Sequence, residues 1–414
     1  MRFIVIPILL LVAVSSVTVA QDGQKSFGIS FSGFVKTDML YDSRETVNVR
    51  EGHFLLYPAA ERAGAEGVDL NETPSFNMLS IQTRLKGDIT GPEALGARTS
   101  GQIEGEFFGM TDGDINGFRL RHAFVKLDWG STALLVGQTW HPMFVAECYP
   151  GVVSFNTGAP FQPFSRNPQV RVTQSFGGLR LIGVAATQRD FPSIGPDASG
   201  NPVTSSMFLR HAILPNLHFQ AQYLADGHVF GAGVDYKQLL PSTATGIGTL
   251  SEETIAGTSL IGYAKLDLAP VTIKAEGTLG QNLSDLLQFG GFAMTAMDAA
   301  TGEATYTTLD SYSVWGEVMY GKEFEVALFA GYSENLGAEE NFLPGALYAR
   351  GANIASLLRV SPRVQYTAGK VRFALELEYT SADYGTPEAD NKGLVADTKS
   401  VANTRVLAAV FYFF

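Results

Sequence analysis

Arginine and glutamate side chains recur at every second position in several stretches of this 414-residue chain. Arg119 and Arg121 form one such pair, and Glu104 and Glu106 form another. A guanidinium group binds two oxygens of a carboxylate or a phosphate at once. Paired carboxylates can exchange protons with a substrate or form ion pairs with arginine. Two interpretations are open: a path for small anions, or ion pairs that keep a polar interior hydrated.

Other charged side chains share the polar faces of predicted strands. They are Arg84, Lys86, Arg171, Glu276, Arg372, Glu376 and Glu378. The basic ones gather between Arg84 and Arg171, whereas Glu376 and Glu378 come late in the chain. If the first and last strands meet in a closed sheet, we expect a basic wall to face an acidic one. Such an arrangement orients polar solutes in a pore.

Composition and motifs give no support to other chemistries. The six histidines are scattered outside catalytic or metal-binding motifs, and the alternation places His122 on the outward side of its strand. Asp112, Asp114 and Asn116 fit a solvated turn or a calcium site, with the turn preferred. The net charge of −12 disfavours nucleic-acid binding, and the single Cys148 excludes a disulfide framework. We therefore predict no enzyme activity, no metal and no cofactor.

Apolar and polar residues alternate along many segments, which predicts β-strands with one apolar face. In one segment the apolar residues are Val371, Phe373, Leu375, Leu377 and Tyr379, and the polar ones are Arg372, Glu376, Glu378 and Thr380. In another, Phe118, Leu120 and Phe124 alternate with Arg119 and Arg121. The apolar faces are rich in aromatics and the polar faces are often charged, which fits a membrane barrel with its apolar side outward.

The connections between the predicted strands alternate between short and long. The short ones are 129–131, 177–178, 215–216, 269–270, 322–323 and 369–370, and the long ones are 42–74, 141–167, 190–204, 283–310, 334–352 and 384–400. Short periplasmic turns and long external loops are typical of outer-membrane barrels. The predicted strand length of about 10–14 residues also suits a tilted membrane strand better than a soluble sandwich.

The number of strands is constrained by parity. The alternation yields roughly 17 segments, whereas bacterial barrels have even numbers of strands. Counting turns from both ends makes 229–239 and 254–268 run in the same direction. Either a weak strand lies in 240–253 or one segment does not span. We predict an all-β, antiparallel up-and-down transmembrane barrel of about 16 strands, with 18 as the alternative.

Both ends of the chain predict an outer-membrane location. Residues 1–20 combine Arg2, a short apolar run and a small-residue end at Ala20, as in a cleaved signal peptide; a membrane anchor is the alternative. Residues 21–414 are predicted to form one barrel domain. The last strand places Tyr412 and Phe414 on one face with a terminal Phe, which resembles the signal that the barrel-assembly machinery recognises.

Residues 141–167 form an unusual long connection. Four prolines interrupt strand and helix patterns, yet the segment is apolar and Glu147 is its only charge before Arg166. Its candidate packing residues are Trp140, Phe144, Tyr149, Phe155, Phe161 and Phe164. A long apolar loop must pack against something. It is a candidate constriction loop inside the barrel, or a segment that packs outside against a neighbouring barrel.

Residues 118–129, 136–140 and 166–171, taken together, resemble the DcaP-like porins of Gram-negative outer membranes. The resemblance covers about residues 118–171. It implies a trimeric porin whose third loop folds inward and which passes small anions such as dicarboxylates. It also points to Arg119, Arg121, Arg166 and Arg171 as site residues. His141-Pro142 and the sequence Glu147-Cys148-Tyr149-Pro150 depart from the pattern of the family.

The expected function is therefore passive diffusion of small hydrophilic solutes, with small anions preferred. The expected surroundings are the lipid bilayer with its lipopolysaccharide, and the expected assembly is a homotrimer. A structural or adhesin barrel without significant conductance is the alternative. An outer-membrane hydrolase has less support, because no Ser–His or Asp–His site is indicated by the spacing of these residues.

Overall fold

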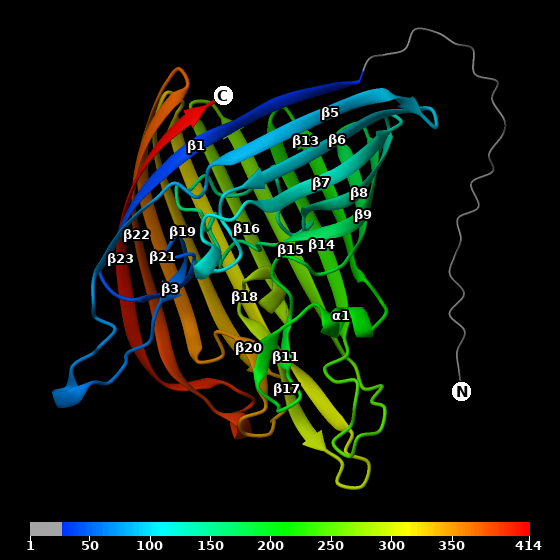
Figure 1. The fold of residues 1–414 in the computed structure, drawn as a ribbon, viewed down its shortest axis with the longest axis vertical. Helices are drawn as coiled ribbons and strands as arrows, with labels where there is room; N and C mark the ends of the chain where they lie inside the picture. The colour runs from blue at the N-terminus through cyan, green and yellow to red at the C-terminus, as the bar shows by residue number, and fades with distance from the viewer. Residues whose placement is uncertain (1–26) are drawn as a thin grey trace.

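The computed structural model describes residues 27–414, which form a closed antiparallel β-barrel of 16 strands (Figure 1). The first strand, β1 (Gly28–Asp42), pairs on one side with the last strand, β23 (Val395–Phe413), and on the other with β5 (Arg84–Ala94). This pairing closes the ring and confirms 16 strands rather than 18. The predicted signal peptide, residues 1–20, lies outside the described residues.

The remaining strands of the barrel follow one another in chain order. They are β6 (Ala97–Glu106), β7 (Arg119–Asp128), β8 (Thr132–Trp140), β9 (Arg166–Phe176), β10 (Leu179–Ala186), β13 (Asn216–Ala225), β14 (His228–Leu239), β15 (Ile255–Leu268), β16 (Val271–Gln281), β18 (Ala304–Gly321), β19 (Phe324–Ala338), β21 (Ile354–Ala368) and β22 (Val371–Pro387).

Shorter elements belong to the external connections. They are β2 (Thr46–Val49), β3 (Phe54–Pro58), β4 (Ser75–Leu79), β11 (Ile194–Pro196), β12 (Pro202–Thr204), β17 (Gly290–Met297), β20 (Leu347–Arg350), the helix α1 (Met207–His211) and the 3-10 helices η1 (Ala65–Gly67), η2 (Asp112–Asp114), η3 (Leu283–Leu286) and η4 (Ala389–Asn391). Within residues 27–414 there is no helix of the length and apolarity needed to cross a membrane.

The miscounted segment is the one that leads to Pro215. It contains α1, whose Phe208 and Leu209 are buried in the external connection between β10 and β13. The predicted short turn at 215–216 is therefore wrong. The periplasmic turn in this region is Asp226-Gly227, and both residues have positive φ angles of 50° and 85°. Asp-Gly is the usual sequence for a tight hairpin turn of this kind.

The barrel wall is apolar outside and polar inside, as the alternation predicts. On β22, Leu375 and Leu377 are 49% and 43% exposed on the outer face, whereas Glu376 and Glu378, which flank Leu377, are at most 1% exposed. The same alternation continues to the C-terminus. Side chains that a soluble protein would place in its core therefore cover the outer surface of this barrel, where lipid is the expected solvent.

Candidate functional site

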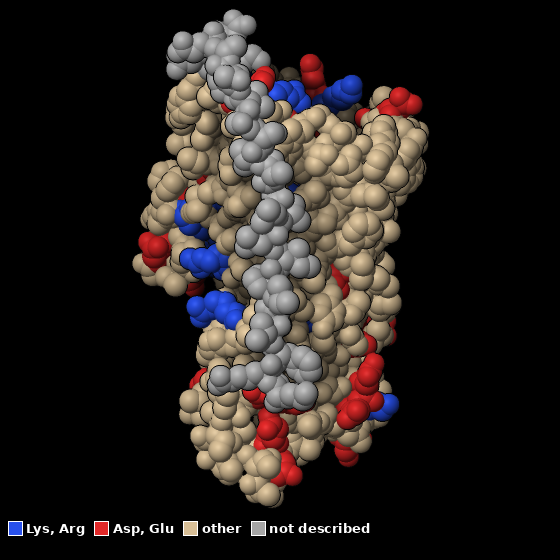
Figure 2. Space-filling view, turned by 90° about the vertical axis from the view of Figure 1, so that its right-hand side faces the viewer, with Lys and Arg blue, Asp and Glu red and all other residues tan. Residues whose placement is uncertain are grey.

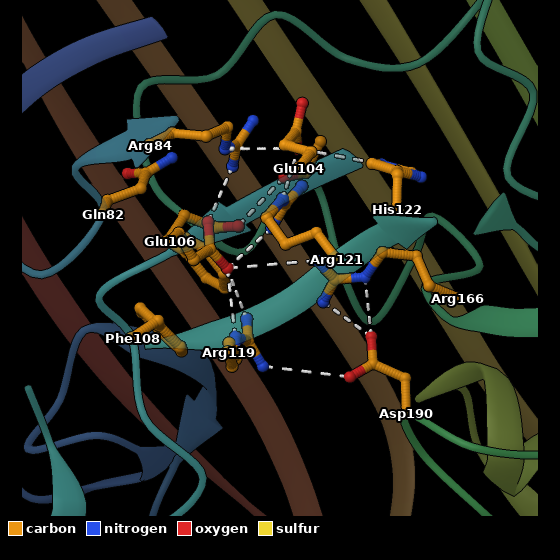
Figure 3. Close-up of polar contacts among 12 residues, drawn as sticks. Gln82, Arg84, Glu104, Glu106, Phe108, Arg119, Arg121, His122, Arg166 and Asp190 are labelled. Atoms are coloured by element: carbon orange, nitrogen blue, oxygen red, sulfur yellow. Dashed lines mark hydrogen bonds and ion pairs between the residues drawn. The ribbon is translucent and has the colours of Figure 1, made fainter. Parts of the chain in front are cut away.

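A set of ion pairs surrounds Glu106 at the end of β6 that leads into the external connections (Figure 3). Its carboxylate is fully buried and accepts hydrogen bonds from Arg119 Nη2 and Arg121 Nη1, both at 2.7 Å. Arg84 Nη2 donates to the other carboxylate oxygen at 2.9 Å. Hydrogen bonds between charged groups are short and strong, so Glu106 holds three guanidinium groups from neighbouring strands together.

Two more carboxylates complete this set. Glu104 Oε1 lies 2.7 Å from Arg121 Nε, and Asp190 Oδ2 lies 2.6 Å from Arg166 Nη2. We call the whole set the arginine cluster: Arg84, Arg119, Arg121 and Arg166 with Glu104, Glu106 and Asp190. Four guanidinium groups against three carboxylates leave a net positive charge. Charge of one sign on the wall of a narrow passage favours solutes of the opposite sign.

A bulge in β7 turns two successive side chains toward the lumen. The register of β7 against β6 shifts next to Glu104, which makes Arg121 the extra residue. A bulge re-aims the side chains that follow it. The outward placement predicted for His122 and Phe124 is therefore wrong, because His122 is only 5% exposed and Phe124 lies on the inner face after the shift. Strict alternation assigns the wrong face to the residues that follow a bulge, because the extra residue shifts the period by one.

Gly137 on β8 pairs with Phe124 on β7, just after this bulge. Its φ angle is +135°, and an added Cβ would lie 2.3 Å from the carbonyl oxygen of Ala123 on β7. We predict that Gly137→Ala lowers the stability of the barrel by about 1–3 kcal/mol because both the backbone angle and the space favour glycine. The midpoint of urea unfolding, followed on a semi-native gel, measures this. Gly183→Ala is the control, since its Cβ meets nothing within 4 Å; equal midpoints would contradict the prediction.

Residues 141–165, here called loop 3, lie inside the barrel between β8 and β9. The opposite wall holds the middle of the loop: Glu376 Oε2 accepts a hydrogen bond from Val153 N at 2.6 Å, and Lys36 Nζ donates to Val153 O at 2.8 Å. Arg359 Nη1 donates to Ala159 O at 2.7 Å. Lys36, Glu376 and Arg359 are at most 1% exposed. Loop 3 therefore fills the lumen at the level of these side chains.

The aromatic side chains of loop 3 pack behind the arginine cluster. Trp140 and Phe144 stack with ring centroids 3.7 Å apart, and Phe155 stacks on Phe108 at 3.9 Å. The Arg166 guanidinium lies 4.9 Å from the centroid of the Trp140 ring, a distance at which cation and ring attract each other. The other candidate packing residues of the loop are the buried Phe161 and Phe164 and the partly exposed Tyr149.

A second segment shares the lumen with loop 3. The hairpin of β2 and β3 turns into the barrel, and Phe54 is 1% exposed. Arg359 donates a hydrogen bond to Leu56 O, and Tyr384 Oη donates to Pro58 O at 2.6 Å. The sequence predicts only an external loop for residues 42–74. The pattern of alternating residues did not reveal that this hairpin lies in the lumen. The available signal is the continuous apolar run of β3, which an exposed loop would not carry.

Two of the predicted site residues lie away from the arginine cluster. Lys86 Nζ pairs with Asp88 at 2.7 Å, further along β5 toward the periplasmic turn. Arg171 Nη2 donates to Trp140 O at 2.8 Å and lies beneath the start of loop 3. Asp190, by contrast, belongs to the cluster and was not predicted. It follows β10 in a connection without periodicity, so no local pattern marks it as a lumen residue.

The expected basic wall facing an acidic wall is not present. Glu376 and Glu378 share their part of the wall with three buried arginines, Arg359, Arg363 and Arg405. The arginines of the other wall are likewise matched by the carboxylates of the arginine cluster. Both walls are mixtures of positive and negative side chains, and many of these charges pair with neighbours in the same region of the lumen. Of the predicted charge separation, the structure retains only a local excess of positive charge at the arginine cluster.

The described part of the chain offers no ligand set for a metal: no group of three or more His, Cys, Asp or Glu side chains within 27–414 is placed to hold an ion. Asp112 instead accepts a hydrogen bond from the Arg50 N–H at 2.7 Å. Cys148 is fully buried in loop 3, and burial raises the pKa of its thiol to about 12. The reactive thiolate is therefore scarce at neutral pH.

Comparison with known proteins places the fold among outer-membrane channels. No family model matches the chain, and no curated protein matches it in sequence. The outer membrane channel DcaP of Acinetobacter baumannii matches with a TM-score of 0.68 and 17% identity, covering 96% of this chain and 100% of that chain.

Two further solved structures match less closely. The trimer form of OmpT, an outer membrane protein of Vibrio cholerae, has a TM-score of 0.54 and 10% identity, covering 94% of this chain and 100% of that chain. Salmonella typhi OmpF in complex with daunomycin has a TM-score of 0.50 and 13% identity, covering 93% of this chain and 97% of that chain. At these identities the matches establish the fold. The resemblance to DcaP-like porins is confirmed at that level.

Proposed function

We propose that this chain is a porin of the bacterial outer membrane, through which small hydrophilic solutes diffuse passively past loop 3. The fold it shares with the outer membrane channel DcaP supports a channel. We also propose that small anions, such as dicarboxylates, pass in preference to cations. The observation that carries this preference is the arginine cluster, in which four guanidinium groups lie beside loop 3 with three carboxylates.

The chemistry of the cluster suits transient binding of anions. Guanidinium groups stay charged over the whole accessible pH range, and their planar fork matches a carboxylate. A pore also requires that its solute leave again, so binding sites that conduct must hold it weakly. The carboxylates of the cluster supply that balance, since they offset most of the positive charge. An arginine cluster without them would trap an anion.

The assembly proposed for this porin is a homotrimer in a bilayer that contains lipopolysaccharide. The trimer form of the Vibrio cholerae OmpT match supports the oligomeric state. Residues 1–20 are proposed as the export signal. Tyr412, near the end of β23, and Phe414, the residue after that strand, are proposed as the signal for the barrel-assembly machinery. They are 53% and 47% exposed, so a partner protein can reach them.

A reversal-potential measurement in a planar bilayer tests the anion preference. In a potassium chloride gradient we expect wild-type protein to give a potential of the sign that chloride permeation produces. Arg119→Ala combined with Arg121→Ala should move this potential toward the cation side, because two of the four guanidinium groups are lost. The shift should shrink as the salt concentration rises, since salt screens the cluster.

The control removes two arginines elsewhere. Arg62 and Arg98 are both exposed, and neither contacts the arginine cluster. Arg62→Ala combined with Arg98→Ala should leave the reversal potential at the wild-type value. A cation-selective wild type whose potential does not respond to loss of Arg119 and Arg121 would refute the proposed anion path.

A structural barrel with little conductance is the second candidate, and the packing of the lumen favours it. Glu106, Lys36 and Arg405 are inward charges on different strands, and each is fully buried. In a wide open pore such side chains contact water. Single-channel recording separates the two candidates, because a structural barrel gives no current steps at any applied voltage. Resolved steps in the wild type would reject the structural barrel.

A further inference from the structure

Asp190 reaches the arginine cluster from residues 187–215, the connection that follows β10 and is here called loop 4. Its Oδ2 atom lies 2.8 Å from Arg166 Nε and 2.6 Å from Arg166 Nη2. Its Oδ1 atom faces Arg119 Nη1 at 3.8 Å. The carboxylate therefore sits between two guanidinium groups that belong to different strands, β9 and β7 (Figure 3).

The neighbours of Asp190 fix this position. Gln188 Nε2 donates to Asp285 Oδ2 at 2.9 Å, and the Arg189 N–H donates to Asn167 Oδ1 at 3.1 Å. The ring of Phe191 contacts the rings of Phe54 and Phe164, each with centroids 6.0 Å apart. Loop 4 is thus anchored on both sides of Asp190, and these contacts hold the carboxylate at the arginine cluster.

The carboxylate of Asp190 does not satisfy all the hydrogen-bond donors of Arg166 and Arg119. Arg166 is 1% exposed, yet its Nη1 and Nη2 atoms have no partner with hydrogen-bond geometry among the described residues. The distance of 3.8 Å from Arg119 to Asp190 is also too long for a hydrogen bond. A buried donor without an acceptor costs free energy. A mobile carboxylate between Arg119 and Arg166 can adopt a better geometry than one tied to loop 4.

Space for an exchange lies next to these groups. A cavity of about 240 Å³ is lined by Arg119, Asp190, Arg189 and Gln138. Its other lining side chains, Met110, Phe118 and Leu120, are about half exposed, so the cavity opens to the outer side of the wall. The Arg189 side chain forms no ion pair within residues 27–414. The cavity therefore offers room and a free positive charge beside the carboxylate of Asp190. Loop 4 does not have to unfold for that carboxylate to leave Arg166.

From this geometry, and resting on the proposed anion path, we propose that Asp190 is an internal stand-in for the solute. Its carboxylate occupies the subsite between Arg119 and Arg166 when the lumen holds no anion, and the carboxylate of an anionic solute displaces it. The exchange swaps one ion pair for another and needs no co-reactant. It keeps the buried guanidinium groups paired in the empty channel and keeps the net affinity for the solute low, as passage requires.

Block of the chloride current by potassium malonate tests this proposal. Asp190→Asn retains the size of the side chain but removes the competing charge. We expect the half-blocking malonate concentration to fall about tenfold at low salt, and the reversal potential to move further to the anion side. Asp190→Glu keeps the charge on a longer side chain that reaches Arg119 as well, so it should raise the half-blocking concentration.

Asp88→Asn is the matched control. It removes one negative charge from an inward position paired with Lys86 at 2.7 Å, away from the arginine cluster. It should leave the malonate block unchanged. If Asp190→Asn and Asp88→Asn have the same half-blocking malonate concentration, the stand-in role is overturned. It is also overturned if Asp190→Glu has the half-blocking concentration of the wild type. Should Asp190→Asn fail to fold, Asp190→Glu decides alone.

The same measurements distinguish this failure from failure of the anion path. If malonate blocks the wild type and the block is lost in Arg119→Ala with Arg121→Ala, the anion path stands whatever Asp190 does. If malonate blocks neither protein and their reversal potentials agree, the anion path itself is wrong. In that case the stand-in role falls with it.

Discussion

Replacing residues 151–158 of loop 3 with a Gly-Ser linker of the same length should raise the single-channel conductance several-fold. A 16-stranded barrel is wide enough for an aqueous channel when nothing fills it. Loop 3 fills it here because its backbone and side chains are bound across the lumen. Gly151 N donates to Glu317 Oε1 at 2.9 Å, and Asn156 Nδ2 donates to Glu378 Oε2 at 3.0 Å.

The size of the expected effect follows from what the linker cannot replace. It has no side chain for the stack that Phe155 forms on Phe108, and it has no amide side chain for Glu378. Hydrogen bonds to charged groups contribute about 1.5–3 kcal/mol each. Without these contacts, the conformational entropy that a flexible linker loses by staying in the lumen costs more free energy than its binding there returns.

Cys148 gives an independent measure of the same change. In the wild type its thiol is buried and has a pKa of about 12, so a maleimide should not label it at neutral pH. Release of loop 3 should expose the thiol and allow labelling. The matched control is the same linker in place of residues 243–250, in the external connection between β14 and β15. Unchanged conductance together with an unlabelled Cys148 would mean that residues 151–158 do not narrow the lumen.

The barrel was predictable because the signal for a membrane strand is local. On β22 the alternation of Leu375 and Leu377 with Glu376 and Glu378 is visible in four successive residues, and the structure reproduces it. The strand count is wrong at the segment that leads to Pro215 because the prediction there also used only local sequence. The apolar residues of α1 are buried among loops, and apolar content alone does not distinguish that burial from contact with lipid.

The arginine cluster was predictable only in part. The inward direction of Arg119 follows from alternation, but the bulge at Arg121 and the partner role of Asp190 do not. A bulge depends on how two strands fit, and Asp190 reaches the cluster through anchors on Asn167 and Asp285, both distant in the chain. Contacts set by tertiary register leave no period in the sequence.

Replacing Glu106 with alanine should lower the free energy of unfolding by about 3–5 kcal/mol, the usual cost of leaving buried charges without their partner. Glu106 is fully buried and accepts hydrogen bonds from Arg84, Arg119 and Arg121. Urea unfolding in lipid vesicles, followed by tryptophan fluorescence, measures the change. Glu106→Gln should cost less, because its amide oxygen still accepts a hydrogen bond.

Glu61→Ala provides the contrast. Glu61 pairs with Lys399 at 2.7 Å, but both side chains are well exposed, and exposed pairs contribute about 0–1 kcal/mol. Adding Arg121→Ala to Glu106→Ala should recover part of the lost stability, since it removes one of the unpaired charges and the two effects are coupled. If Glu106→Ala costs no more than Glu61→Ala, water already screens the arginine cluster. A screened cluster would also attract anions only weakly, so this measurement bears on the anion path as much as on the barrel.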